Sequence, residues 1–241
     1  MKKILALTSI LLAGGLAASA VTITPSYGNF GSLANANFGG KGIPNNAVAT
    51  TTIANGNDSI TLGLTATARY LNPTVGNDGA GTFSATSGMN FGNPANPSDQ
   101  SLSTHDYATW NFDWYINLTD ASSSAYSFKL LYGNNTTATS SGFVIPTGTS
   151  GLTSTTSGTG QDSWNLSMGF MNNIGFDANA SGVYGFELQA FDAAGDLLGS
   201  TAINVDVRSV PDTGSSVTLL GCALIGIAFF SLRQNRRQTA K

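Results

Sequence analysis

The chain has 241 residues, and only 10% of them are charged, against about 25% in typical soluble domains. Residues 21–209 contain four basic and twelve acidic residues, which gives this part a net charge of −8. An acidic body lacks the basic face that nucleic acid requires, so we expect no nucleic-acid partner. The only cysteine, Cys222, lies near the C-terminus, which excludes a disulfide or a cysteine nucleophile in residues 21–209.

The first 20 residues have the organisation of a secretory signal peptide. Lys2 and Lys3 give it a positive start, and a short apolar run follows. Ala18 and Ala20 supply the small residues of a cleavage site. We therefore predict cleavage after Ala20 and an exported domain over residues 21–209.

This domain is predicted to be all-β, because apolar and polar residues alternate along several segments. The alternating segments are residues 60–70, 110–118, 126–132, 184–190 and 203–207. No segment shows the 3.6-residue period of an amphipathic helix. Strands with one apolar face each combine most simply as an antiparallel β-sandwich, for which jelly-roll and immunoglobulin-like topologies both remain open.

Two connections are predicted to be hairpins. A serine-rich turn beginning at Asp120 joins residues 110–118 to 126–132, and residues 192–196 join the last two strands around a left-handed Gly195. Residues 133–160 contain 20 Gly, Ser or Thr among 28 residues and no charge. We predict a long flexible loop there, with residues 143–145 as a short strand inside it.

No constellation of residues predicts catalysis. His105 is the only histidine, and no Gly-x-Ser-x-Gly elbow accompanies it, so a loop histidine is the preferred interpretation. Glu187 and Asp113 are the pair to consider for glycoside hydrolysis, but each is predicted to be a solvated residue on the polar face of its strand. We expect a protein that is not an enzyme.

Calcium is the one ion for which the domain offers ligands. Asp177 with Asn179, and Asp192 with Asp196, have spacings that allow carboxylate and amide oxygens to converge on a hard cation. Asx-turns explain the same residues without a metal. We therefore expect no obligatory cofactor and keep these four residues as weak calcium candidates.

Two aromatic side chains are candidates for stacking on sugar rings. Trp164 follows the predicted flexible loop and is expected to be exposed, and Tyr115 lies on the polar face of its strand. Trp110 and Trp114 share the apolar face and are expected to pack in the core.

The C-terminal 32 residues, 210–241, have three parts in a fixed order. A pentapeptide comes first, then a predicted transmembrane helix over residues 215–232, and then a basic tail over residues 233–241. The pentapeptide consists of Val210, Pro211, Asp212, Thr213 and Gly214. The stop-transfer charges are Arg233, Arg236 and Arg237, which the positive-inside rule keeps in the cytoplasm.

This tail resembles the PEP-CTERM class of sorting signals, in the variant with a Val-Pro-Asp-Ser-Gly signature, and Thr213 stands where that signature has Ser. The resemblance implies processing by a membrane-embedded exosortase, in bacteria that produce exopolysaccharide. The pentapeptide is also similar to the Leu-Pro-x-Thr-Gly signal of sortase-anchored wall proteins. A plain single-span anchor is the third interpretation.

We expect a structural or adhesive protein of the cell surface or extracellular matrix, held in the membrane by its C-terminal helix before processing. Exopolysaccharide is the partner that the resemblance suggests. The alternative is a carbohydrate-binding module that retains exopolysaccharide through exposed aromatic rings.

Overall fold

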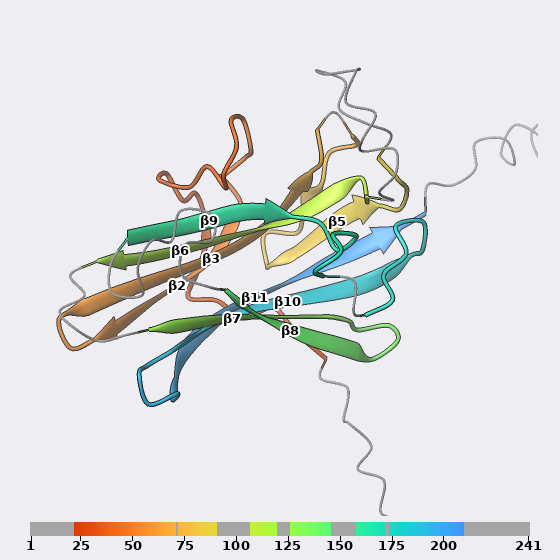
Figure 1. Ribbon diagram of the computed structural model, residues 1–241. Helices are drawn as coiled ribbons and strands as arrows, with labels where there is room; N and C mark the ends of the chain where they lie inside the picture. Colours follow the sequence, from red (N-terminus) through yellow and green to blue (C-terminus); the bar gives the residue numbers. More distant parts are fainter. Residues whose placement is uncertain are drawn as a thin grey trace, which may run out of the picture.

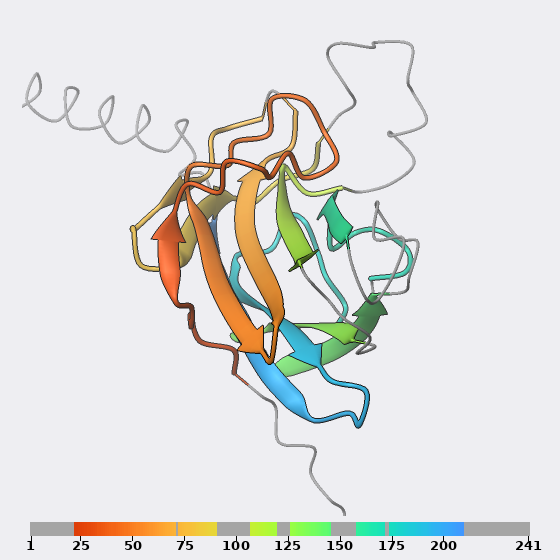
Figure 2. The same ribbon diagram turned by 90° about the vertical axis from the view of Figure 1, so that its left-hand side faces the viewer.

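Two β-sheets face each other across a shared apolar core (Figures 1 and 2). The computed structural model describes residues 22–70, 72–90, 107–119, 126–145, 158–171 and 174–209, and in this part the chain is all-β, as predicted. The strands are β1 (Asn29–Gly31), β2 (Val48–Asn55), β3 (Asp58–Ala68), β4 (Gly76–Asn77), β5 (Thr82–Thr86), β6 (Trp110–Thr119), β7 (Ser127–Asn134), β8 (Thr139–Ile145), β9 (Gly158–Trp164), β10 (Gly182–Phe191) and β11 (Leu197–Arg208).

The strands are antiparallel to their neighbours except at one place. The five-stranded sheet has the order β1-β2-β3-β6-β9, and the six-stranded sheet has the order β4-β5-β11-β10-β7-β8. All the pairs are antiparallel except β5 with β11, which run parallel from Thr82 opposite Asn204 to Thr86 opposite Arg208. The sandwich is therefore confirmed, but one of its sheets is mixed.

The core forms where the apolar faces of β3 and β6 meet those of β10 and β11. Its central contact is the stacking of Phe112 on Phe186, with ring centroids 4.3 Å apart and both side chains fully buried. Burial of each such ring contributes about 1.5–3 kcal/mol to the stability of the fold. The alternating residues predicted to face inward are buried: Ile60, Leu62, Leu64, Trp110, Phe112, Trp114, Tyr184, Phe186, Leu188, Ile203, Val205 and Val207.

The predicted hairpin between residues 110–118 and 126–132 is wrong. β6 pairs with β3 and β9 in one sheet, whereas β7 pairs with β10 and β8 in the other. Alternation fixes which face of a strand is buried, but it does not choose the neighbouring strand, and here the chain crosses from one sheet to the other. The turn that begins at Asp120 lies outside the described residues.

The hairpin between β10 and β11 is confirmed. The Asp192 carboxylate accepts hydrogen bonds from the backbone N–H groups of Ala194 and Asp196, both at 2.9 Å. Gly195 has a φ of 87°, which is the left-handed conformation predicted for it.

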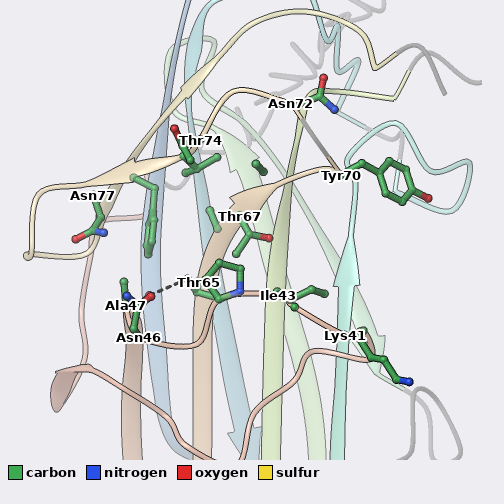
Figure 3. A pocket seen from close by; sticks show the side chains of 17 residues that line it. Lys41, Ile43, Asn46, Ala47, Thr65, Thr67, Tyr70, Asn72, Thr74 and Asn77 are labelled. Carbon is green, nitrogen blue, oxygen red and sulfur yellow. Dashed lines mark hydrogen bonds between the residues drawn. The ribbon is translucent and has the colours of Figure 1, made fainter. Parts of the chain in front are cut away.

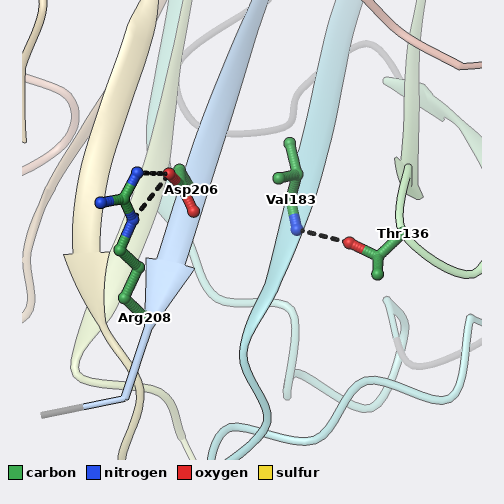
Figure 4. A network of polar contacts seen from close by, with 4 residues as sticks. All are labelled: Thr136, Val183, Asp206 and Arg208. Carbon is green, nitrogen blue, oxygen red and sulfur yellow. Dashed lines mark hydrogen bonds and ion pairs between the residues drawn. The ribbon is translucent and has the colours of Figure 1, made fainter. Parts of the chain in front are cut away.

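The predicted loop over residues 133–160 begins and ends as sheet. Residues 133–145 complete β7 and form β8, so the strand predicted at residues 143–145 is longer than expected, and residues 158–160 begin β9. β8 and β9 are edge strands of their sheets, and their Thr residues are compatible with extended backbone because β-branched side chains are enriched in strands. Thr136, in the turn of the β7–β8 hairpin, accepts a hydrogen bond from the Val183 backbone N–H at 3.0 Å (Figure 4). Residues 146–157 lie outside the described part.

Candidate functional site

The outer face of the five-stranded sheet is covered by a segment of the chain, residues 33–47. Ala36 and Phe38 of this covering segment pack with Val48 and Tyr115 in a second apolar cluster. The segment is held to β9 because the Gln161 side-chain oxygen accepts hydrogen bonds from two of its backbone N–H groups, at residues 37 and 38, both at 2.8 Å. Thr65 and Thr67 of β3 and Asn111 and Asp113 of β6 are therefore buried on this face, while the polar residues of β9 are partly exposed.

Asp113 is the most deeply buried charged residue of this face. Its side chain has no exposed surface, and its Oδ2 atom accepts a hydrogen bond from the Thr67 hydroxyl at 2.8 Å. Burial raises the pKa of Asp113 to about 7, the nearby charge of Asp162 adds to the rise, and hydrogen bonds from Ser163 and Thr67 oppose it. Because the carboxyl group is closed off from solvent, it has no access to a substrate.

A second group of hydrogen bonds fixes Asn111 beside it. The Asn111 carbonyl oxygen accepts hydrogen bonds from Asn165 Nδ2 at 2.9 Å and from Arg69 Nη1 at 3.3 Å. The Asn111 amide nitrogen donates to the Ser163 hydroxyl at 2.9 Å. Asn165 is itself fully buried and also donates to the backbone carbonyls of residues 108 and 110. These amides and hydroxyls are therefore held in fixed orientations.

Arg69 lies at the end of β3 between two aromatic rings. Its guanidinium carbon is 4.9 Å from the ring centroid of Tyr70 and 4.4 Å from that of Tyr107. Arg69 is 8% exposed, and burial lowers its pKa, while the two tyrosines oppose that change. Among the described residues the one ion pair joins Arg208 to Asp206 (Figure 4), so Arg69 has no carboxylate partner there.

Two hollows open beside Arg69 and meet at Tyr70, which lines both. The smaller one has a volume of about 310 Å³ and the larger one a volume of about 720 Å³ (Figure 3). The smaller hollow is lined by Phe38, Gly39, Gly40, Ile43, Arg69, Tyr70, Asn111, Asp162, Ser163 and Met168. The larger hollow is lined by residues 40–44, 46–47, 65–68, 70, 72, 74–75, 77 and 83. We call the two together the groove.

Tyr70 is the exposed aromatic residue of the groove, with 45% of its surface accessible. The Asn72 side chain donates to the carbonyl oxygen of Arg69, which closes a turn, and Tyr70 inside the turn has a φ of 52°. The alternation had placed Tyr70 on the buried face of its strand, but β3 ends at Ala68. The dipeptide Asn72-Pro73 is the turn signal in the sequence that predicts this ending.

The two aromatic residues predicted to bind sugar are buried, so the expectation that they are exposed is wrong. Trp164 is 5% exposed because it lies opposite Phe112 on the inward face of the sheet, and its ring centroid is 5.2 Å from that of Trp114. Its indole N–H donates to Asp162 at 2.8 Å. Tyr115 is 4% exposed because the covering segment packs over it.

The four calcium candidates are not brought together. Asp177 accepts a hydrogen bond from the Asn179 backbone N–H at 2.9 Å, while Asp192 caps the turn that contains Asp196. The two pairs lie beyond opposite ends of β10, whose ten residues span about 33 Å. No group of three His, Cys, Asp or Glu residues in the described ranges is placed to hold a metal ion.

Asp113 and Glu187 are separated by the sandwich. Asp113 is on β6 of the five-stranded sheet and Glu187 is on β10 of the six-stranded sheet, each on the outer face of its sheet. Because packed sheets are about 10 Å apart and both side chains point outward, the pair does not flank a single bond. His105 lies outside the described residues.

The comparison with protein families gives one finding. Residues 209–233 match the VPDSG-CTERM motif, an exosortase-type C-terminal sorting signal, which confirms the predicted resemblance. The matched range includes the pentapeptide at residues 210–214 and Arg233. Neither a curated protein nor a solved structure matched the chain. The sorting signal implies an exported, surface-associated protein.

The remaining predicted targeting residues have no structural description. Ala18, Ala20, residues 210–214, Arg236 and Arg237 all lie outside the described ranges. Within those ranges, no helix has the length and apolar character needed to cross a membrane. The predicted transmembrane helix at residues 215–232 therefore stays a prediction.

Proposed function

We propose that the chain is a non-catalytic exported protein, whose β-sandwich serves as a structural or adhesive unit at the cell surface or in the extracellular matrix. The observation that carries this proposal is the position of the sorting signal. β11 ends at Arg208, and the matched motif begins at residue 209. The domain is thus joined directly to the segment on which an exosortase-type enzyme acts.

The experiment is the intact mass of the mature protein from cells that export it, with cells and medium fractionated separately. We expect a chain that begins at Val21 and ends at or near residues 210–214. A mature chain that still carries Arg236 and Lys241 contradicts the proposal and indicates a plain membrane anchor. A chain that ends at Thr213 and is linked to wall material indicates a sortase.

A pair of double variants separates recognition of the motif from general effects on the tail. Pro211→Ala with Gly214→Ala should leave the C-terminus unprocessed, because both the rigid proline and the glycine are removed. Gln238→Ala with Thr239→Ala, outside the matched range, is the matched control and should be processed normally. Normal processing of the first variant would show that the pentapeptide is not the recognised element.

The groove favours one refinement of this function. It combines an exposed aromatic ring with fixed amide, hydroxyl and guanidinium groups, which is the kind of lining expected of a carbohydrate-binding surface. This supports the alternative of a carbohydrate-binding module, at a different place from the one predicted.

A further inference from the structure

We propose that the groove binds an uncharged polysaccharide chain, with the ring of Tyr70 as the platform on which one sugar packs. The inference rests on the proposed function in one respect, namely that export brings the groove into contact with polymers outside the cell. It adds the location of the site, the class of ligand and the residues in contact with it.

The shape of the groove suits a chain rather than a single small molecule. The two hollows share Tyr70 and residues 40 and 43 of the covering segment as lining, so a ligand extends from one to the other past Tyr70. Small-molecule sites have volumes of about 300–1,000 Å³. The hollows, at about 310 Å³ and 720 Å³, therefore have room for successive sugars on either side of the Tyr70 ring.

The Tyr70 ring is held in place before any ligand binds. The guanidinium of Arg69 lies against one side of the ring, and the turn closed by Asn72 fixes the backbone. Among the described non-glycine residues, positive φ values occur at Phe38, Tyr70 and Ala138, and the first two line the smaller hollow. Residues held in such sparsely populated conformations tend to cluster at ligand-binding sites. The C–H face of a pyranose ring packs on a fixed aromatic surface of this kind.

The polar groups of the smaller hollow match hydroxyl groups. Arg69 donates and Asp162 accepts, and Ser163 has acceptor capacity left after its proton is directed at Asp113. Arg69 is 92% buried, and its Nε–H has no acceptor among the described residues. This nitrogen has almost no accessible surface, so Arg69 faces a ligand only through the part of its side chain that lines the smaller hollow.

The charge of the smaller hollow favours a neutral ligand. Arg69 and Asp162 both line it, so their opposite charges offset each other. A uronic acid or a sulfated sugar would approach the Asp162 carboxylate with a charge of the same sign. In the larger hollow Lys41 is the one charged lining residue, and hydroxyl and amide groups such as Thr67 and Asn72 lie beside apolar ones. In Figure 3 the ring of Tyr70 points away from Thr65 and Thr67, on the side of the hollow opposite Thr74 and Asn77.

The test is affinity electrophoresis of the full-length chain, kept in a zwitterionic detergent that carries no sugar headgroup. The gels contain dextran, a soluble β-glucan or a galactomannan as neutral polymers, and alginate as the acidic one. We expect at least one neutral polymer to retard the wild-type protein and alginate to leave its mobility unchanged.

Three variants locate the binding. Tyr70→Gly removes the ring at a position where glycine adopts the observed φ without strain, and it should weaken binding about tenfold, as expected for the loss of one aromatic contact. Tyr70→Phe keeps the ring and should retain binding within about threefold, since it loses only the phenolic hydroxyl. Phe170→Ala removes a ring that is equally exposed, at 48%, but does not line the groove, and it should leave binding unchanged.

The outcomes are distinct from those of the sorting experiment, because binding is measured on the unprocessed chain. The proposal would be overturned if none of the three neutral polymers retarded the wild-type protein, or if alginate alone retarded it. Binding that survives Tyr70→Gly but is lost in Phe170→Ala would place the site elsewhere. None of these results bears on whether the tail is processed.

Discussion

The two sheets share one core but differ on their outer faces. In the six-stranded sheet the outward residues of β7 and β10, such as Lys129, Glu187 and Gln189, are partly exposed. In the five-stranded sheet the corresponding residues of β3 and β6, such as Thr67 and Asp113, are buried beneath the covering segment. Among the described residues, the covering segment lies on the second sheet, whereas Ile23 packs on the outer face of the six-stranded sheet at Gly185.

The difference between the two outer faces is that polar groups are buried on the five-stranded sheet, which is energetically unfavourable by itself. Burying a carboxyl group and several amides is unfavourable unless each finds a partner, and the hydrogen bonds of Asn111 and Asn165 supply most of those partners. The groove opens at the edge of this network. The candidate site therefore lies beside the covered polar face, and β7 and β10 of the open polar face contribute no residue to the lining of the groove.

The largest expected effects on stability come from substitutions in the apolar core that the two sheets share. Phe112→Ala on β6 and Phe186→Ala on β10 each remove one ring of a stacked, fully buried pair, and each should lower the free energy of unfolding by about 3–5 kcal/mol. The double variant should cost less than the sum, because the two rings contact each other. Urea unfolding followed by tryptophan fluorescence measures all three. If one of the two single variants lowered the free energy of unfolding by less than about 1 kcal/mol, the sheet that carries that ring would contribute little to the stability of the shared core.

The next effect is a pH dependence that arises from the covered face. The pKa of Asp113 is raised to about 7 from an ordinary value of 3.8, so between these limits the folded protein binds a proton that the unfolded chain does not. Stability from this group should be fully present below about pH 4 and fall as the pH rises to about 7, by up to about 1.4 kcal/mol per pH unit.

Asp113→Asn isolates this contribution, since an amide of the same shape does not titrate in this range. The difference in unfolding free energy between wild type and variant, measured from pH 4 to pH 8, should decrease up to about pH 7 and then level off. A difference that is constant over the whole range would mean that the outer faces of the two sheets do not differ in this respect.

The smallest effects compare one polar residue from each outer face. Asn165→Ala removes the side-chain donor to the carbonyl of Trp110 and leaves the Asn111 oxygen with Arg69 as its donor, so it should cost about 1–3 kcal/mol. Gln189→Ala on the open face should change stability by less than about 0.5 kcal/mol. Thermal unfolding of the two variants in parallel is sufficient, and equal costs would remove the distinction drawn between the faces.

The long strands β3, β6, β7, β10 and β11 were predictable, because alternation along their residues reports burial of one face, whereas β1, β2, β4, β5 and β9 were not predicted. The partner of each strand was not predictable. Residues 110–118 and 126–132 follow each other closely in sequence, yet β6 and β7 lie in opposite sheets. Alternation carries no information about which neighbour supplies the backbone hydrogen bonds, since these are the same for every residue type.

The groove was not predictable for a related reason. Tyr70 continued an alternating pattern, and only Asn72-Pro73 indicated that the strand had ended. Trp164 was expected to be exposed because the Gly-, Ser- and Thr-rich residues before it suggested a loop, whereas they run into an edge strand. Burial of Asp113 depends on the covering segment, which packs on its sheet through contacts distant in sequence.

The burial of Ile23 near the N-terminus bears on the order of signal-peptide cleavage and folding. Ile23 is 3% exposed, and its backbone N–H and C=O both form hydrogen bonds with the Asn135 side chain. It packs so closely on Gly185 of β10 that a Cβ atom added to this glycine would lie 2.5 Å from the Cβ atom of Ile23. The predicted cleavage site after Ala20 is only three residues earlier, a reach of about 10 Å at most. A peptidase needs an extended substrate on both sides of the bond it cuts. We therefore expect the predicted cleavage to precede docking of Ile23 against β10, so that this contact forms late in folding.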